Sequence, residues 1–170
     1  MIYEALSCLA GEINEHFKNV LKLNEDKVIL SAIVNQDGSI AIQDENKVVI
    51  TLLNITKELS AKNAPPVHGG QHEATPVHIN LSVMLLAYFA AANYSESLRF
   101  ISFVINFLES KPVFTVSNTP SLNPGIEKMI LDMETADAER LSNIWATIGA
   151  KYMPSVLYKI RMVTQLTAND

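Results

Sequence analysis

Apolar residues recur at three- and four-residue steps between positions 2 and 21, which predicts an amphipathic helix from about Ile2 to Leu21. The apolar stripe consists of Ile2, Leu6, Leu9, Ile13, Phe17 and then Val20 or Leu21. Charged residues such as Glu12 and Lys18 occupy the other side. The helix is therefore expected to bury one face and to expose the other.

Strand-like stretches follow at residues 28–34 and 40–43. They are joined by Asn35-Gln-Asp-Gly38, a sequence typical of a hairpin turn. Residues 47–55 are apolar on both faces, and such a strand belongs in the middle of a sheet that is covered on both sides.

Residues 77–88 predict an unusually long strand with one apolar face. Its opposite face starts polar, with His78, Asn80 and Ser82, and then turns apolar. The preceding residues 60–75 lack periodicity and are rich in proline and glycine, which predicts a long loop. Loops of this length are uncommon in compact domains and are usually either functional or disordered.

A second helix is predicted to open with Asn93 and Glu96 at capping-box spacing and to stop at Lys111-Pro112. Its polar residues form one narrow stripe, so we expect it to be buried over most of its circumference. Short strands are predicted around residues 113–116 and 128–134.

The segment from Leu141 to Arg161 predicts a short helix ending at Gly149, a turn closed by Pro154 and an alternating strand. Trp145 lies on the apolar stripe of this helix, which favours a core anchor over an interface hot spot. On the strand, Lys159 and Arg161 share one face. They are expected either to meet an acidic partner surface or to discourage edge-to-edge association.

The composition is compatible with a single domain over residues 1–170, with its long loop at 60–75. Hydrophobic residues make up 48% and charged residues 18%, against roughly a quarter charged in ordinary soluble proteins. Three explanations stay open: an unusually apolar core, a surface covered in an assembly, or scatter in composition.

The formal net charge of −5 argues against a general phosphate-binding surface but leaves room for a local basic strip. Cys8, the single cysteine, has no partner for an internal disulfide and is expected to be a small buried residue. We find neither a signal peptide nor an apolar run long enough for a membrane span, so synthesis in the cytoplasm is expected.

One cluster has metal-ligand chemistry: His68, His72, Glu73 and His78. Pro66 and the adjacent glycines argue against the helix that would aim His68 and His72 at one ion. A flexible polar loop that is ordered by a partner is the favoured interpretation. No nucleophile motif such as Gly-x-Ser-x-Gly accompanies any histidine, so neither an enzymatic activity nor a cofactor is predicted.

Several segments resemble the N-terminal domain of the cap proteins, or tail terminators, of contractile injection systems of the antifeeding-prophage type. The matching segments are Phe114–Pro120, Pro124–Lys128, Leu141–Arg161, Met1–Leu9 and Val77–Arg99, the last with its Asn93-Tyr-Ser-Glu96. The similarity runs over nearly the whole chain. Residues 68–73 have no match in the family pattern.

The resemblance implies a mixed α/β (α+β) fold, similar to the tail terminators of contractile phages. A central mixed or largely antiparallel β-sheet would be flanked by about three main α-helices. The resemblance also implies a hexameric ring that ends the inner tube, stops its growth and anchors the last sheath layer. The implied partners are further copies of the chain and the tube and sheath proteins of a phage-tail-like particle, with no nucleic acid and no membrane insertion. The family has no catalytic residues to transfer.

A ring of this kind uses heterologous interfaces, in which one patch meets a different patch on the next copy. We expect the long loop and the polar faces of two strands to supply contacts between subunits or with tube and sheath. These interface candidates are His68, Gly69, Gly70, Gln71, His72, His78, Asn80, Ser82, Lys159 and Arg161. Two other hypotheses remain: an adaptor that binds one partner as a monomer or dimer, and a small metal-dependent hydrolase that uses the histidine loop.

Overall fold

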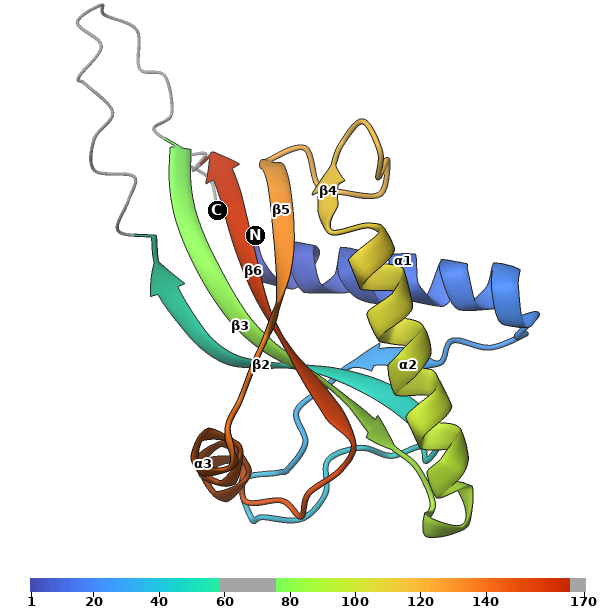
Figure 1. The fold of residues 1–170 in the computed structure, drawn as a ribbon. Helices are drawn as coiled ribbons and strands as arrows, with labels where there is room; N and C mark the ends of the chain where they lie inside the picture. Colours follow the sequence, from blue (N-terminus) through green and yellow to red (C-terminus); the bar gives the residue numbers. More distant parts are fainter. Residues whose placement is uncertain (59–75, 166–170) are drawn as a thin grey trace, which may run out of the picture.

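The computed structural model describes residues 1–58 and 76–165, which form three α-helices and one six-stranded sheet (Figure 1). The helices are α1 (Ile2–Leu21), α2 (Tyr94–Ser110), which follows a 3₁₀ turn at Ala91–Asn93, and α3 (Ala138–Ile148). The strands are β1 (Val28–Leu30), β2 (Lys47–Lys57), β3 (Pro76–Tyr88), β4 (Val113–Thr115), β5 (Ile126–Glu134) and β6 (Ser155–Gln165).

The strands lie in the order β1-β2-β3-β6-β5-β4. β1 and β2 run parallel, and all other neighbours are antiparallel. The predicted fold class, a mixed α+β domain around a largely antiparallel sheet, is therefore confirmed. At the centre, β3 and β6 pair without a break from Pro76 opposite Gln165 to Leu86 opposite Ser155.

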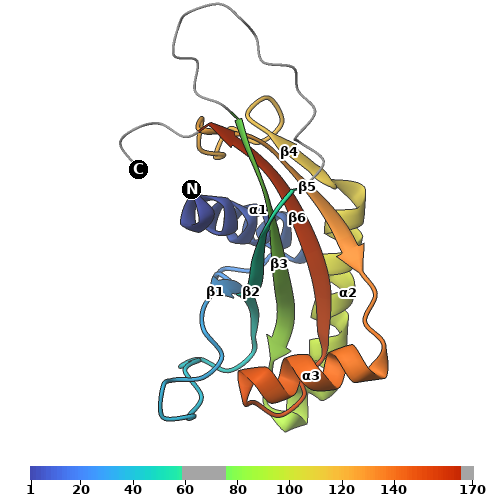
Figure 2. The ribbon, with the colours of Figure 1, turned by 90° about the vertical axis from the view of Figure 1, so that its left-hand side faces the viewer.

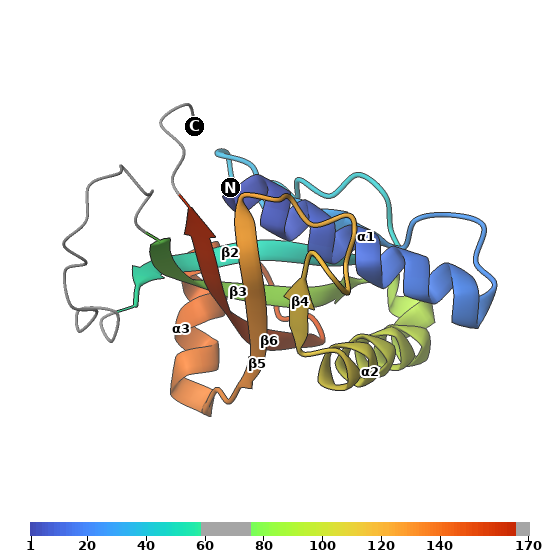
Figure 3. The same cartoon turned by 90° about the horizontal axis from the view of Figure 1, so that it is seen from above.

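The helices cover the two faces of the sheet unequally. α1 and α2 pack on one face, whereas α3 lies on the other and crosses only its lower part (Figures 2 and 3). The main core lies under α1 and α2 and includes Leu9, Phe17 and Phe100. A smaller core under α3 is built around Trp145 and Met84. No helix of residues 1–58 or 76–165 covers the upper part of this second face, and we call it the open face.

The helix predicted at residues 2–21 is confirmed, and its apolar stripe is buried as expected. The predicted capping box of α2 is wrong. The Asn93 side chain makes no cap bond, and its Nδ2 donates to Asn46 Oδ1 at 2.9 Å. α2 is also less buried than predicted: Phe100 and Val104 face the core, but Leu98 is 44% exposed. Apolar residues on α2 are therefore found outside the helix face that packs against the core.

The predicted strands at 28–34 and 40–43 are shorter in the structure. β1 ends at Leu30, and the second stretch contributes only an antiparallel bridge between Val34 and Ile40. The turn between them is confirmed, with Gly38 at φ +84 and its amide bonded to the Asn35 carbonyl. Ile33 and Ile42 pack into the smaller core, so their apolar character serves packing rather than a strand ladder.

The predicted helix, turn and strand within residues 141–161 are confirmed. The alternative that Lys159 and Arg161 discourage edge-to-edge association is wrong, because β6 lies inside the sheet between β3 and β5. Gly149 caps α3 in the left-handed conformation at φ +76, and its amide donates to the Trp145 carbonyl. The Pro154 carbonyl then accepts a hydrogen bond from the Ala87 amide, which fixes the turn against β3. Trp145 is only 6% exposed and belongs to the smaller core, in agreement with its predicted role as an anchor.

Candidate functional site

The register between β3 and β6 brings the predicted polar residues of the two strands onto the open face. Asn80 lies directly opposite Arg161, and Ser82 lies opposite Lys159. His78 comes one step further along the same side of β3, opposite Val163. Directly opposed residues of an antiparallel pair project from the same face, so all these side chains share one surface.

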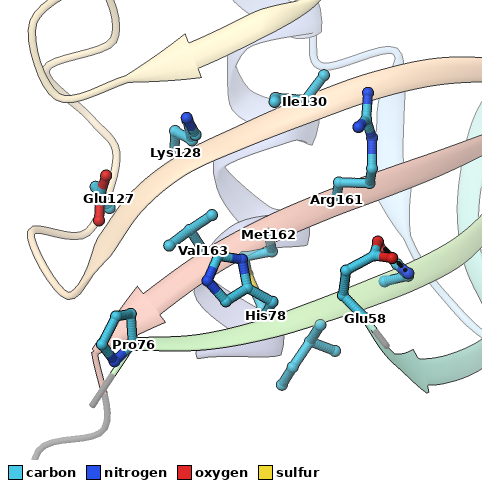
Figure 4. Close-up of a pocket in the computed structure, with 11 residues that line it drawn as sticks. Glu58, Pro76, His78, Glu127, Lys128, Ile130, Arg161, Met162 and Val163 are labelled. Carbon is cyan, nitrogen blue, oxygen red and sulfur yellow. Dashed lines mark hydrogen bonds between the residues drawn. The ribbon is translucent and has the colours of Figure 1, made fainter. Parts of the chain in front are cut away.

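A groove of about 500 Å³ is hollowed into this surface (Figure 4). β3 supplies His78 and Asn80, β6 supplies Arg161, and β5 supplies Lys128 and Ile130. A further wall comes from Glu58, which directly follows β2. The groove exists because α3 covers only the lower part of this face, so on this side no helix of the described residues contacts the upper ends of β3, β6 and β5.

Two polar contacts fix the groove side chains. Asn80, only 6% exposed, donates through Nδ2 to Glu58 Oε2 at 2.9 Å. Arg161 holds Asp132 with both Nε and Nη2, at 3.0 and 2.9 Å from the same carboxylate oxygen. Both members of that ion pair are about half exposed, so water screens it and its contribution to stability is small.

On this surface the carboxylates of Glu58 and Asp132 have hydrogen-bond or ion-pair partners, whereas the lysine side chains have none among the described residues. Glu58 and Asp132 are bonded as described, whereas the ammonium groups of Lys128 and Lys159 make no hydrogen bond or ion pair within residues 1–58 and 76–165. Asn80 Oδ1 is also buried without a partner in those residues. The surface therefore offers ammonium groups to a partner, in a chain whose net charge is −5.

The hypothesis of a metal-dependent hydrolase finds no supporting arrangement of side chains in residues 1–58 and 76–165. In the described part of the chain, no three side chains of the ligand-forming types are placed to share an ion. His78 lies in the groove wall, whereas His68, His72 and Glu73 fall outside the described residues. Gly69, Gly70 and Gln71 fall outside them as well, so their part in an interface stays a prediction.

Cys8 is buried, as predicted, with 8% of its surface exposed. Burial is the main cause that raises the pKa of its thiol, and the thiol lies 3.5 Å from Ser121 Oγ. A thiol held in its protonated form is a poor nucleophile, so this residue acts as a packing element. No helix in residues 1–58 or 76–165 has the length and hydropathy that a membrane span requires.

Among the polar residues that line the groove, Glu58, Glu127 and Lys128 were missed in the sequence. Glu58 stands between a predicted strand and a predicted loop, and Lys128 starts a short strand. Neither position has a pattern that predicts its spatial neighbours. The pairing of Lys128 with Val163 brings β5 to the groove, and the pairing of Lys57 with Ile79 brings Glu58 next to Asn80.

We compared the chain with known proteins. No curated protein matches the sequence. Among solved structures, the chain is similar to the sheath/tube terminator, in its extended state, of the extracellular contractile injection system PVC. That TM-score is 0.66 at 16% identity, over 98% of this chain and 57% of the other. The chain is also similar to the tube-terminating cap of the anti-feeding prophage, with TM-score 0.51 and 15% identity over 81% of this chain and 51% of the other.

The chain thus spans little more than half the length of each of these two proteins. At such identities the likeness establishes a common fold. The sequence profile of the Pvc16 N-terminal domain family matches residues 4–169, which confirms the resemblance read from the sequence. Because this match covers nearly the whole sequence, the chain belongs to the Pvc16 N-terminal domain family.

Proposed function

We propose that this chain is the capping domain of a contractile injection particle. Six copies form a ring that ends the inner tube and anchors the last layer of the sheath. The protein acts by shape and has no enzymatic role. It is made in the cytoplasm and becomes part of the phage-tail-like particle.

The observation that carries the proposal is the shared fold. The chain aligns over 98% of its length with a protein described as a sheath/tube terminator, and its residues 4–169 match the Pvc16 N-terminal domain family. The open face supports a contact role, because it carries the ammonium groups of Lys128 and Lys159 and no helix of residues 1–58 or 76–165 covers it. Polar and charged surfaces of this kind set the register and the choice of partner in an interface.

The contacting surface is the open face, with His78, Asn80, Ser82, Lys159 and Arg161 as its centre. Residues 68–72 are proposed to contribute from the adjoining loop. Within a ring, this surface meets a different patch on the next copy, or the tube and sheath proteins.

Electron microscopy of particles made with and without the protein tests the proposal. We expect six-fold density at the end of the tube when the protein is present, and tubes of uncontrolled length without it. Tubes of normal length in its absence would sink the proposal. A protein found at a different place, bound as a single copy or a dimer, would favour the adaptor hypothesis.

The open face is tested by reversing two charges in Lys159→Glu combined with Arg161→Glu. Arg161 is exposed and Lys159 is half-buried, so the variant is expected to fold while capped particles become at least tenfold rarer, an effect of about 1.4 kcal/mol. Lys22→Glu combined with Arg99→Glu makes the same change of net charge on exposed residues away from the open face. This control should cap normally. Equal loss in both variants would mean that net charge, rather than the open face, matters.

A further inference from the structure

α2 carries a row of apolar side chains beside the face that packs on the core. Tyr94 is 58% exposed and Leu98 is 44% exposed, and the half-buried Ile101 is part of neither core of the described residues. Side chains at three- and four-residue steps lie in one row on a helix, so these three form a ridge, which we call the α2 ridge. Arg99 lies on the other side of α2, where it lines a pocket with Leu21 of α1.

α3 carries an apolar groove, which we call the α3 groove. It measures about 610 Å³, and Ala138, Ser142 and Ala146 line it at four-residue steps along the helix. Tyr152, from the turn after α3, forms another part of its wall, and Lys151 is its one charged lining residue. Small side chains on a helix let a second helix approach closely, because the distance between packed helices depends on the side chains at the contact.

The same groove is lined by a buried side chain with an unsatisfied polar group. Trp145 is only 6% exposed and lines the α3 groove. Its indole Nε1 is buried and makes no hydrogen bond within the residues that the structure describes. Buried indole N–H groups usually have a partner. Together with the apolar lining, this donor without an acceptor indicates that another molecule completes the surface.

The α2 ridge and the α3 groove lie on opposite sides of the molecule. α2 packs on one face of the sheet and α3 on the other. In Figure 1, α3 lies to the left of the strands and α2 to the right, and in Figure 2 α3 lies in front of the sheet with α2 behind it. The ridge and the groove of one copy therefore do not meet each other. A protruding surface on one side and a matching hollow on the other are the two halves of a heterologous interface, which closes into a ring when the rotation between copies permits.

We propose that the α2 ridge of each copy packs into the α3 groove of the next copy, with Leu98 and Ile101 against Ala146. This contact rests on the ring proposed above, and it specifies which surfaces join the subunits. A second copy is selected as the occupant because the chain itself supplies both halves. The apolar character agrees, since interfaces between identical subunits have a more apolar core than other interfaces.

The direct test is chemical crosslinking in purified particles, with Cys8 replaced by alanine. Ser102→Cys places a thiol one turn beyond Leu98, and Ser142→Cys places one in the α3 groove; both serines are exposed. A short bis-maleimide reagent should join the double variant into a ladder that ends at the six copies of the proposed ring. Each step of the ladder has the mass of one further chain, so a tube or sheath protein would be recognised by its different mass.

Either single variant should stay uncrosslinked, because the ridge of one copy meets the groove of the next and never a second ridge. The absence of a ladder from the double variant would overturn the proposal. Dimers formed by one single variant would overturn it as well, since they would show that like surfaces meet.

Two matched pairs of variants, made in the crosslinkable double variant, test the two halves separately. Leu98→Asp places a carboxylate in the contact, whereas Val20→Asp places one on an exposed apolar residue of α1. Ala146→Arg fills the α3 groove, whereas Thr147→Arg lies on the side of α3 that faces Leu52 and Leu53. We expect the ladder to weaken at least tenfold for the first member of each pair and to stay unchanged for the second. Equal loss within both pairs would overturn the proposal.

The contact and the capping function can fail independently. If electron microscopy shows a six-fold cap but the double variant gives no ladder, the contact is wrong and the capping function stands. If the ladder forms and responds to the variants as expected while tubes keep their normal length without the protein, the capping function is wrong and the contact stands.

Discussion

Asn14 of α1 holds the backbone of Val28 in β1 at both its polar groups. Asn14 Nδ2 donates to the Val28 carbonyl and Asn14 Oδ1 accepts from the Val28 amide, each at 2.8 Å. The same Oδ1 also accepts from the Lys27 amide at 2.8 Å. One buried side chain thus attaches the edge strand to the first helix.

Asn14→Ala is therefore expected to lower the free energy of unfolding by about 2–3 kcal/mol, because it leaves buried backbone groups without partners. Urea unfolding followed by circular dichroism measures this. Asn19→Ala, on the exposed side of the same helix, should stay within about 0.5 kcal/mol of the unmodified protein. Similar losses in both variants would mean that Asn14 contributes helix propensity rather than a link to β1.

Substitutions at two glycines are expected to have opposite effects on stability. Gly149 has φ +76, so Gly149→Val is expected to cost roughly 1–2 kcal/mol, although nothing crowds the new Cβ. Gly11 lies inside α1 with open space around it, so Gly11→Ala should stabilise by about 1 kcal/mol. Thermal unfolding distinguishes the two. Destabilisation by both substitutions would contradict the assignment of the Gly149 effect to its backbone conformation.

Ionisation of Tyr158 is expected to lower the free energy of unfolding in alkaline solution. Burial, followed by the charge of Glu109, raises the pKa of this phenol above its ordinary value of 10.0. Above pH 10 the phenol loses its proton in the unfolded state but keeps it in the folded state. The stability linked to the raised pKa is therefore complete below pH 10 and is lost as the pH rises further. The Tyr158 hydroxyl also donates to Glu109 Oε1 at 3.2 Å.

Tyr158→Phe lacks both the titrating proton and that hydrogen bond. At pH 8 it should be about 1 kcal/mol less stable than the unmodified protein. The difference should shrink between pH 10 and pH 11.5, because only the unmodified protein must keep its phenol protonated. Urea unfolding of both proteins at pH 8, pH 10 and pH 11.5 measures this difference in the free energy of unfolding. A difference that stays constant would contradict the raised pKa.

Tyr152 packs against the single tryptophan of the chain. The ring centroids of Trp145 and Tyr152 are 5.6 Å apart in an edge-to-face arrangement, and Tyr152 is 61% exposed. Tyr152→Ala should therefore cost about 1 kcal/mol and shift the tryptophan emission to longer wavelength as water reaches the indole. Tyr94→Ala, an exposed tyrosine on α2, should leave the emission unchanged.

Periodicity predicted α1 and α3, because each buries one regular face. It also predicted β3 and β6, whose apolar residues alternate over part of their length although both strands are buried on both faces beside α3. It failed at residues 31–46, where Ile33 and Ile42 are apolar for packing in a loop. It also failed at Asn93, whose side chain bonds to Asn46, a residue far away in the sequence. Local patterns describe local structure, and both failures arise from distant contacts.

Only part of the open face could be predicted from the sequence. Alternation placed His78, Asn80 and Ser82 on one face of a strand, and Lys159 and Arg161 on one face of another. Nothing in the sequence joined these two faces, since the register of β3 against β6 is a non-local property. The groove wall at Glu58 depends on that same register and on the pairing of β2 with β3.

The central pair of strands also governs how the molecule acquires its shape. Partners in β3 and β6 lie ~70 to 90 residues apart in the chain, so the middle of the sheet closes only after a long stretch has been synthesised and gathered. Until then β3, with its row of apolar side chains, has only β2 to pair with on one side. Slow, high-contact-order folding with a transiently exposed strand is the kinetic consequence, and a chaperone that shields β3 would raise the yield.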